Sequence, residues 1–412
     1  MNNYALVILL GYLLVVFLTY GLKYLNLRHL RRHGLEIPPG FENIIDEQTL
    51  KKSMAYTIEY VRFGFLTSIL FTIMLIVFLY GGVLNLYNSW IVSLDLGFIL
   101  SGVLFFLVLS YSNTIISIPF DLYSTFRIEK KYDFNTQTIG LWMVDLIKSF
   151  ILSTILVGAL LVGMFWLIKS SPNWWWLWVW GFFLIFSLFI LYISPYVIEP
   201  LFNKYEPLSV EGLEDRIKAL MSKVGIRVSR VFQMDASKRS KHTNAYFTGI
   251  GKTKRIVLFD TLLEKINPGE ILAVLAHEAG HWKKKHVLKS IIISQIMSFI
   301  GIYIAFRILQ TETLAGWFDI EQPTLMVGFI LLGFIASILN FPFSPILHWF
   351  SWRRERQADR FACELIGNSN DMVNALIKLS KDNLSNLHPH PWYAAFYYSH
   401  PPIITRIKYI KS

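Results

Sequence analysis

One short run of this 412-residue sequence carries metal-binding chemistry, the His-Glu-x-x-His pattern of His277, Glu278 and His281. Residues four apart on a helix share one face, so both imidazoles can reach the same ion. Glu278 lies one residue further round, where its carboxylate can bind the metal or deprotonate a water on it. The apolar residues just before the pattern favour a buried helix, in which these polar groups are costly without a compensating partner. The pattern therefore indicates a site for one zinc ion, and polar residues satisfied at a helix end are the alternative.

Zinc with two histidine ligands needs a third protein ligand and keeps its fourth position for water. Two apolar stretches follow His281, each long enough to cross a membrane, so just before Glu355 the chain returns to the membrane face on which the histidines lie. Asp359 lies one helical turn further on, faces the same way and can hold a ligand imidazole from behind. Glu364 is the main rival as third ligand, and pairing with neighbouring arginines is the alternative role for Glu355 and Asp359. His286 is off the ligand face, which predicts a polar interfacial residue.

The elements that must position these groups are mostly apolar. Of all residues 54% are hydrophobic and only 16% are charged, against roughly 25% in soluble domains. A spanning helix needs about 20 mostly apolar residues. Seven stretches qualify, at about 3–22, 63–84, 96–118, 149–168, 174–198, 290–309 and 324–350. The first has no basic n-region and no cleavage site, so we expect a retained span and not a signal peptide.

The predicted fold class is an all-α polytopic membrane protein of about seven transmembrane helices with a small α/β insertion. We divide the chain into residues 1–200 with five spans, 201–289 with the His-Glu-x-x-His helix, 290–350 with two spans, and 351–412, which completes the zinc site. Within 201–289 we expect a helix at 212–224, extended runs at 227–233 and 255–260, and a helix from Asn267. Pro268 and Glu270 are typical of the first turn of that last helix.

Basic residues are distributed unevenly among the connections. All of the 39 lysines and arginines except Lys169 and Arg307 fall on one side if the N-terminus is outside or lumenal. Lysine and arginine near span ends stay on the cytoplasmic side, so both polar segments are predicted to be cytoplasmic. The net charge of +11 is then a consequence of topology, and the expected partner of these residues is the lipid bilayer, not nucleic acid. The tryptophan run at 174–180 is predicted to form an interfacial aromatic belt.

From about residue 120 onward the chain resembles the CAAX prenyl protease 1 family, the integral-membrane zinc endopeptidases that trim prenylated proteins. Six strings match in order and spacing besides the zinc motif: 126–135, 198–208, 237–249, 254–263, 355–359 and 399–406. The first 120 residues show no motif of the family.

The resemblance implies a role for each matched residue. It implies that His277, His281 and Glu355 bind zinc and that Glu278 is the catalytic base. It also implies an edge strand that pairs with the peptide substrate, made of Asn244, Ala245, Tyr246 and Phe247. His400 and Arg406 match positions that support the transition state. The seven helices are then expected to ring a chamber that the metal site caps on the cytoplasmic side.

The function predicted is a membrane-embedded zinc endopeptidase that cleaves near the C-terminus of a peptide or protein, prenylated CAAX proteins by resemblance. A broad-specificity quality-control zinc protease of membrane proteins shares the metal site and is one alternative. A non-catalytic seven-span transporter or receptor is another, although it would place functional charges inside the spans. The plasma membrane of a bacterium and the endoplasmic reticulum both fit, and no feature of the sequence points to an oligomeric state.

Overall fold

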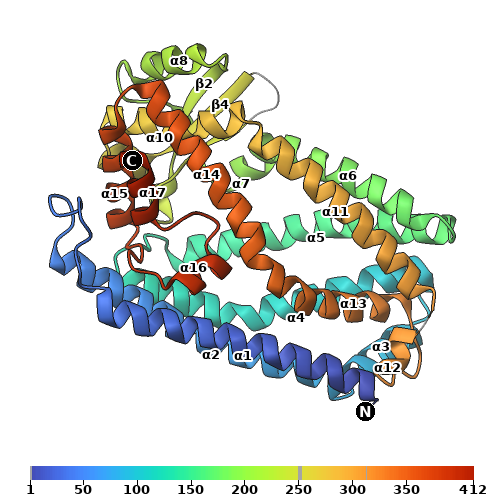
Figure 1. Cartoon of the computed structure of the whole chain (residues 1–412). Helices are drawn as coiled ribbons and strands as arrows, with labels where there is room; N and C mark the ends of the chain where they lie inside the picture. The colour runs from blue at the N-terminus through green and yellow to red at the C-terminus, as the bar shows by residue number, and fades with distance from the viewer. Residues whose placement is uncertain (1, 249–252, 312) are drawn as a thin grey trace.

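Seven long apolar helices dominate the computed structural model, which describes residues 2–248, 253–311 and 313–412 (Figure 1). Each is long and apolar enough to cross a membrane, and each overlaps one of the seven predicted stretches over most of its length. All seven predicted spans are confirmed within the described ranges, and the protein is a multi-pass integral membrane protein. The helical segments are Asn3–His33, Glu47–Tyr80, Gly97–Glu129, Ile139–Ser170, Trp175–Phe202, His286–Leu309 and Leu325–Ile366.

Three of these segments are composite. The third is α4 (Gly97–Tyr123) followed by the π-helix η1 (Ser124–Glu129), and the fifth is α6 (Trp175–Ile193), the π-helix η2 (Ser194–Ile198) and α7 (Glu199–Phe202). The last is α13 (Leu325–Asn340), the 3-10 turn η4 (Phe341–Phe343) and α14 (Ser344–Ile366). The others are α1 (Asn3–His33), α2 (Glu47–Tyr80), α5 (Ile139–Ser170) and α11 (His286–Leu309). π-Helical turns are frequently found at functional sites, and the sequence pattern had not indicated either one.

The long helices meet at the end of the molecule where the N-terminus lies (Figure 1). A cluster of buried side chains that includes Phe105, Phe165 and Phe334 holds this end together. Two short helices that the sequence analysis did not predict, α3 (Val83–Ser93) and α12 (Thr313–Trp317), lie there as well.

The tryptophan run does not form a belt as a whole, so that prediction is wrong in part. Trp174 and Trp178 are exposed, which suits an interfacial position. Trp175, Trp176 and Trp180 instead pack on aromatic side chains of α11. Because successive helical residues point in different directions, only one face of the run can be turned outward.

A small α/β unit lies at the opposite end of the molecule from the N-terminus (Figure 1). Its strands are β1 (Tyr205–Pro207), β2 (Arg227–Met234), β3 (Ala245–Thr248) and β4 (Thr253–Phe259), in the order β1-β2-β4-β3. β2 and β4 are parallel, and β1 and β3 are antiparallel to their neighbours. Its helices are α8 (Leu213–Lys223), η3 (Ala236–Lys238), α9 (Asp260–Lys265) and α10 (Pro268–Lys283). The predicted helices and extended runs of this segment are confirmed, and β1 was not predicted.

Three helices complete the chain, α15 (Ser369–Asp382), α16 (Pro391–Tyr397) and α17 (Ile403–Lys411). Buried residues of α15 and α17 such as Leu376 and Ile407 belong to the same core cluster as Ile217 of α8 and Leu275 of α10. Burial of this shared apolar surface fixes the C-terminal helices to the α/β unit. It thereby holds α10 in place beside α14, the helix that continues the last span.

Candidate functional site

The two histidines of the motif lie on α10, whose start is strongly determined by local sequence. Asn267 caps the helix, and its side chain and that of Glu270 form a reciprocal capping box at Pro268. His277 is buried, and His281 is partly exposed one helical turn later. Their Nε2 atoms are 3.1 Å apart, so both rings point to one place. The predicted face-sharing geometry of the motif is therefore present.

A very close approach of two helices brings the third side chain to this place. A Cβ atom on Gly280 of α10 would lie 3.0 Å from the Cα and 3.1 Å from the carbonyl oxygen of Ala358 on α14. Glycine at this position lets the two helix backbones approach this closely. The contact places Glu355, one turn before Ala358, opposite the two histidines.

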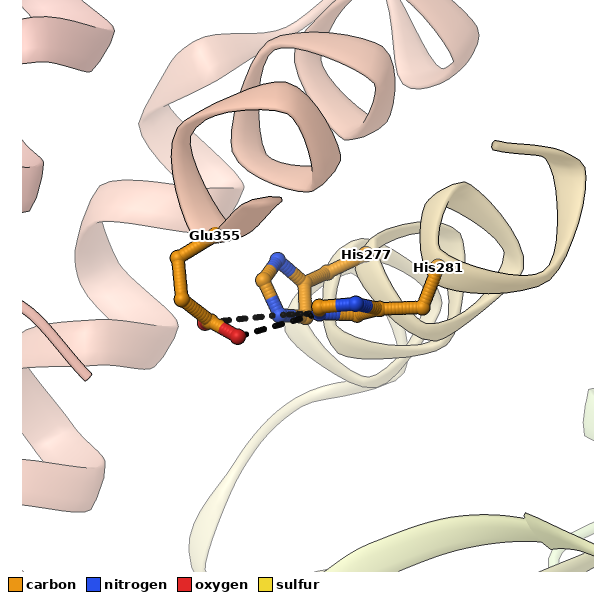
Figure 2. A group of neighbouring side chains, drawn as sticks. All are labelled: His277, His281 and Glu355. Atoms are coloured by element: carbon orange, nitrogen blue, oxygen red, sulfur yellow. Dashed lines mark hydrogen bonds and ion pairs between the residues drawn. The ribbon is translucent and has the colours of Figure 1, made fainter. Parts of the chain in front are cut away.

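Figure 2 shows Glu355 reaching from one helix toward the two imidazoles on the other. Its Oε1 atom is 3.2 Å from Nε2 of His281, and its Oε2 atom is 3.4 Å from Nε2 of His277. The three ligand atoms lie within 4.8 Å of one another. Three atoms bound to one tetrahedral zinc ion lie about 3.3–3.5 Å apart, and two imidazoles with a carboxylate form a usual zinc ligand set. Both the spacing and the chemistry of this group fit a metal ion.

Asp359 holds His277 from behind. Its Oδ1 atom is 2.7 Å from Nδ1 of His277, and both oxygens accept hydrogen bonds from Arg406, from Nε at 2.9 Å and from Nη2 at 2.6 Å. Burial lowers the pKa of His277, but its hydrogen bonds to Asp359 and Glu355 outweigh this and raise the pKa to about 9. Asp359 therefore orients the ring so that Nε2 faces His281 and Glu355.

Arg406 is buried, and its contacts are mainly with Asp359, while its Nη1 atom is 3.9 Å from Oε2 of Glu355. Burial lowers the pKa of Arg406, but the hydrogen bonds that Arg406 donates to Asp359 outweigh this and raise the pKa, so the guanidinium stays charged. These contacts make Arg406 a support of the site, and its role at the transition state stays a prediction.

His400 and Glu278 lie at the rim of the group. The His400 side chain is 61% exposed, and its Nδ1 atom is 2.8 Å from Oε2 of Glu355. Glu278 is half-buried and directly follows His277, and its negative charge contributes to the raised pKa of Arg406. The His400 side chain therefore lies beside the three convergent ligand atoms, and Glu278 directly follows one of the two histidines on α10.

Two alternatives from the sequence do not hold. Glu364, the rival ligand, is 63% exposed and pairs with Arg360 at 2.9 Å. His286, predicted to be a polar interfacial residue, is only 3% exposed, and its Nδ1 atom is 3.0 Å from Nδ1 of His281. The turn at Lys285, which has a positive φ of 57°, folds the start of α11 back toward α10 and buries this ring.

The predicted edge strand is the terminal strand of the described sheet. β3 begins at Ala245 and pairs only with β4, so its other edge carries no strand among the described residues. β3 packs against α10, so the strand lies beside the motif helix. Asn244 lies just before the strand, and its carbonyl oxygen accepts a hydrogen bond from the backbone of Phe259. Pairing of this edge with a peptide stays a prediction.

Two glutamates that sequence reasoning did not single out tie this strand to the long helices. Glu199 directly follows η2, and its carboxylate accepts a hydrogen bond from the hydroxyl of Tyr246 at 2.8 Å. Glu129 is the last residue of η1 and lies 3.4 Å from Nε2 of His242, whose Nδ1 atom is 2.9 Å from Asn383. Both glutamates lie inside sequence strings that match the family, 126–135 and 198–208, but the match did not indicate which contacts they make.

Fold and site together define a metallopeptidase embedded in a membrane. A family model described as the CAAX prenyl protease N-terminal region with five membrane helices matches residues 26–204, and one described as peptidase family M48 matches residues 207–412. The chain belongs to peptidase family M48.

Relatives of known name extend over nearly the whole chain. The CAAX prenyl protease 1 homolog of Arabidopsis thaliana is 34% identical over 97% of this chain and 96% of its own length. The human CAAX prenyl protease 1 homolog is 33% identical over 93% of this chain and 90% of its own length. The Bacillus subtilis protein named uncharacterized metalloprotease YhfN is 32% identical over 81% of this chain and 78% of its own length. The crystal structure of S. mikatae Ste24p matches all of both chains with a TM-score of 0.91 at 30% identity.

These matches correct one expectation. The resemblance begins well before residue 120, because the first family model starts at residue 26. The expected arrangement of seven helices around a chamber, with a small α/β unit at one end, is the fold shared with Ste24p.

Proposed function

We propose that the chain is a zinc endopeptidase that cleaves CAAX proteins near their C-terminus, with His277, His281 and Glu355 as the zinc ligands. The observation that carries this proposal is the convergence of three ligand atoms within 4.8 Å in a chain of family M48. The substrate class comes from the names of the relatives, which are CAAX prenyl proteases in plants, animals and yeast.

A zinc ion in this group would lower the pKa of a water toward ~7 and polarise the scissile carbonyl. Glu278 takes the proton from the attacking water and delivers it to the leaving amine. His400 and Arg406 steady the oxyanion, with the exposed His400 closer to an entering substrate. Asp359 keeps His277 in the tautomer that leaves Nε2 free for the metal.

The peptide is held by β-strand addition. The free edge of β3, preceded by Asn244, offers main-chain groups to an extended segment. Because these bonds do not depend on side chains, the strand can hold many sequences, and the selection of prenylated substrates must come from elsewhere in the molecule. Tyr246 is anchored to Glu199, which keeps the strand aligned with the long helices.

The distribution of basic residues further supports an N-terminus outside or in the lumen and an active site on the cytoplasmic side. In a Cys363→Ser background, an impermeant thiol reagent applied from outside should label Lys169→Cys, whereas Lys284→Cys should react only after permeabilisation. The opposite pattern refutes this orientation.

The proposed chemistry is tested with a reporter peptide and two matched variants. Glu278→Gln should keep bound zinc and lose at least about 100-fold in kcat, since the general base is gone. Glu364→Gln removes an exposed carboxylate on the neighbouring helix and should keep wild-type activity. Cleavage at the wild-type rate by Glu278→Gln would overturn the assignment of the base.

Substrate class is tested with one peptide that carries or lacks a C-terminal farnesyl cysteine. Faster cleavage of the farnesylated form supports the CAAX proposal. Equal rates refute it and favour the broader alternative, a membrane zinc protease without prenyl selection.

A further inference from the structure

The buried His286 is a histidine of the site region to which the mechanism assigns no role. It is the first residue of α11, and Lys285 in a left-handed conformation returns it to the side of α10. Its Nδ1 atom is 3.0 Å from Nδ1 of His281, and its Nε2 atom is 3.0 Å from Oε1 of Gln357 on α14. The ring therefore bridges two of the helices that supply the proposed ligands.

The proton positions along this chain of groups follow from the metal site. His281 turns Nε2 toward His277 and Glu355, so a metal takes the lone pair of Nε2 and the neutral ring carries its proton on Nδ1. That proton points at Nδ1 of His286, which must accept it. A neutral His286 then carries its own proton on Nε2, which faces the amide oxygen of Gln357, an acceptor.

We propose that His286 and Gln357 are positioning residues, a neutral hydrogen-bonded relay that fixes the tautomer and orientation of His281 as a zinc ligand. This inference rests on the proposed zinc site. It makes the two histidine ligands unequal, because His277 is backed by the carboxylate of Asp359 and His281 by an uncharged imidazole.

The surroundings of His286 favour the neutral ring. It lies at the N-terminus of a 24-residue helix, where the helix dipole disfavours positive charge. Gln357 supplies an acceptor that carries no negative charge.

Variants of His286 separate this role from simple packing. His286→Leu removes the acceptor for His281 and should weaken zinc binding by about 10- to 100-fold. His286→Asn places a side-chain oxygen close to the position of Nδ1, so it should restore an affinity close to that of the wild type. Gln357→Leu leaves His286 in place but unoriented, and it should weaken binding by less than His286→Leu.

The experiment uses the full-length protein in detergent and measures zinc affinity by competition with a chromogenic chelator. The visible spectrum of the cobalt-loaded protein reports the geometry of the ligands, and it should change in His286→Leu and revert in His286→Asn. The thermal midpoint of the metal-free protein is recorded for every variant. His33→Leu, a change of a partly exposed histidine at the end of α1, is the matched control and should change none of these values.

Wild-type zinc affinity in His286→Leu overturns the relay, and so does an equal loss in His286→Asn and His286→Leu. If His286→Leu does not fold, Gln357→Leu decides, and an unchanged affinity there overturns the relay. Failure of the proposed function has a different signature, because the wild-type protein itself would then bind no zinc ion.

Discussion

The close contact at Gly280 makes a quantitative prediction about the whole site. In Gly280→Ala the new Cβ would lie 3.0 Å from the Cα of Ala358. Carbon atoms prefer about 3.5–4.0 Å, so α10 and α14 must separate by roughly 0.5 Å. Such overpacking costs about 1–3 kcal/mol, and the better helix propensity of alanine returns about 1 kcal/mol. We expect a net loss of about 0–2 kcal/mol in the free energy of unfolding.

The effect on activity should exceed this small loss of stability. The displaced helices carry the proposed ligands, and functional geometry tolerates only about 0.5 Å of error. Since a misplacement of 1 Å can cost about 100-fold in rate, half that displacement predicts a loss of roughly tenfold in kcat/KM. Zinc affinity should fall with it, because Glu355 on α14 moves away from His277 and His281 on α10.

The assay compares kcat/KM on a reporter peptide, zinc affinity and thermal midpoint in the same detergent. Gly301→Ala is the control, because a Cβ at this position of α11 meets nothing within 4 Å. It should leave activity unchanged. A Gly280→Ala protein that is as active as the wild type and more stable, as expected for an unconstrained helical glycine, would refute the packing argument.

Three further predictions concern the supports of the site and its metal. Asp359→Asn should weaken zinc binding about 10- to 100-fold, because His277 loses its carboxylate partner. It should also lower the free energy of unfolding by about 3–5 kcal/mol, because buried Arg406 loses its charge partner. An unchanged chelator titration and an unchanged denaturation curve would contradict this prediction. Removing the metal with a chelator should abolish cleavage and lower the thermal midpoint, and added zinc should restore both. Free zinc at about 1,000 times its Kd adds about 4 kcal/mol to the free energy of unfolding. Cleavage that persists without metal would exclude a metallopeptidase mechanism. Burial lowers the pKa of His242, but its hydrogen bonds, the one to Glu129 first, outweigh this and raise the pKa. The charged ring therefore stabilises the fold fully below about pH 6.5, and this stabilisation is lost as the pH rises through the raised pKa. The thermal midpoint of the wild type should therefore fall toward that of His242→Gln as the pH rises above about 6.5, and a difference that stays constant with pH would show that the pair does not carry this stability.

Much of the architecture could be read from local sequence. The seven spans were predictable because the thickness of a bilayer sets the length of an apolar segment. The start of α10 was predictable because Asn267 and Glu270 satisfy backbone groups only a few residues away. The paired histidines were predictable for the same reason, since four residues of helix bring them to one face.

The surroundings of the ligands were less accessible from sequence. His286 has an ordinary sequence context, and only the left-handed turn at Lys285 and the proximity of Gln357 reveal its position behind His281. The anchoring of Tyr246 to Glu199 joins residues that are 47 positions apart. The packing of three of the five tryptophans of the run on α11 depended on how α6 is rotated about its axis, which a uniformly apolar segment does not specify.

Helices, spans and the motif itself thus follow from interactions within a few residues, and the linear chain contains all of that information. The convergence of Glu355 with the two histidines needs α10 and α14 to touch at Gly280, and the commitment of Arg406 to Asp359 needs the C-terminal helix to pack into the same core. The first contact joins segments separated by two membrane spans, and the second joins residues that are 47 positions apart. Their geometry is set by side-chain packing across the core, which no local pattern encodes.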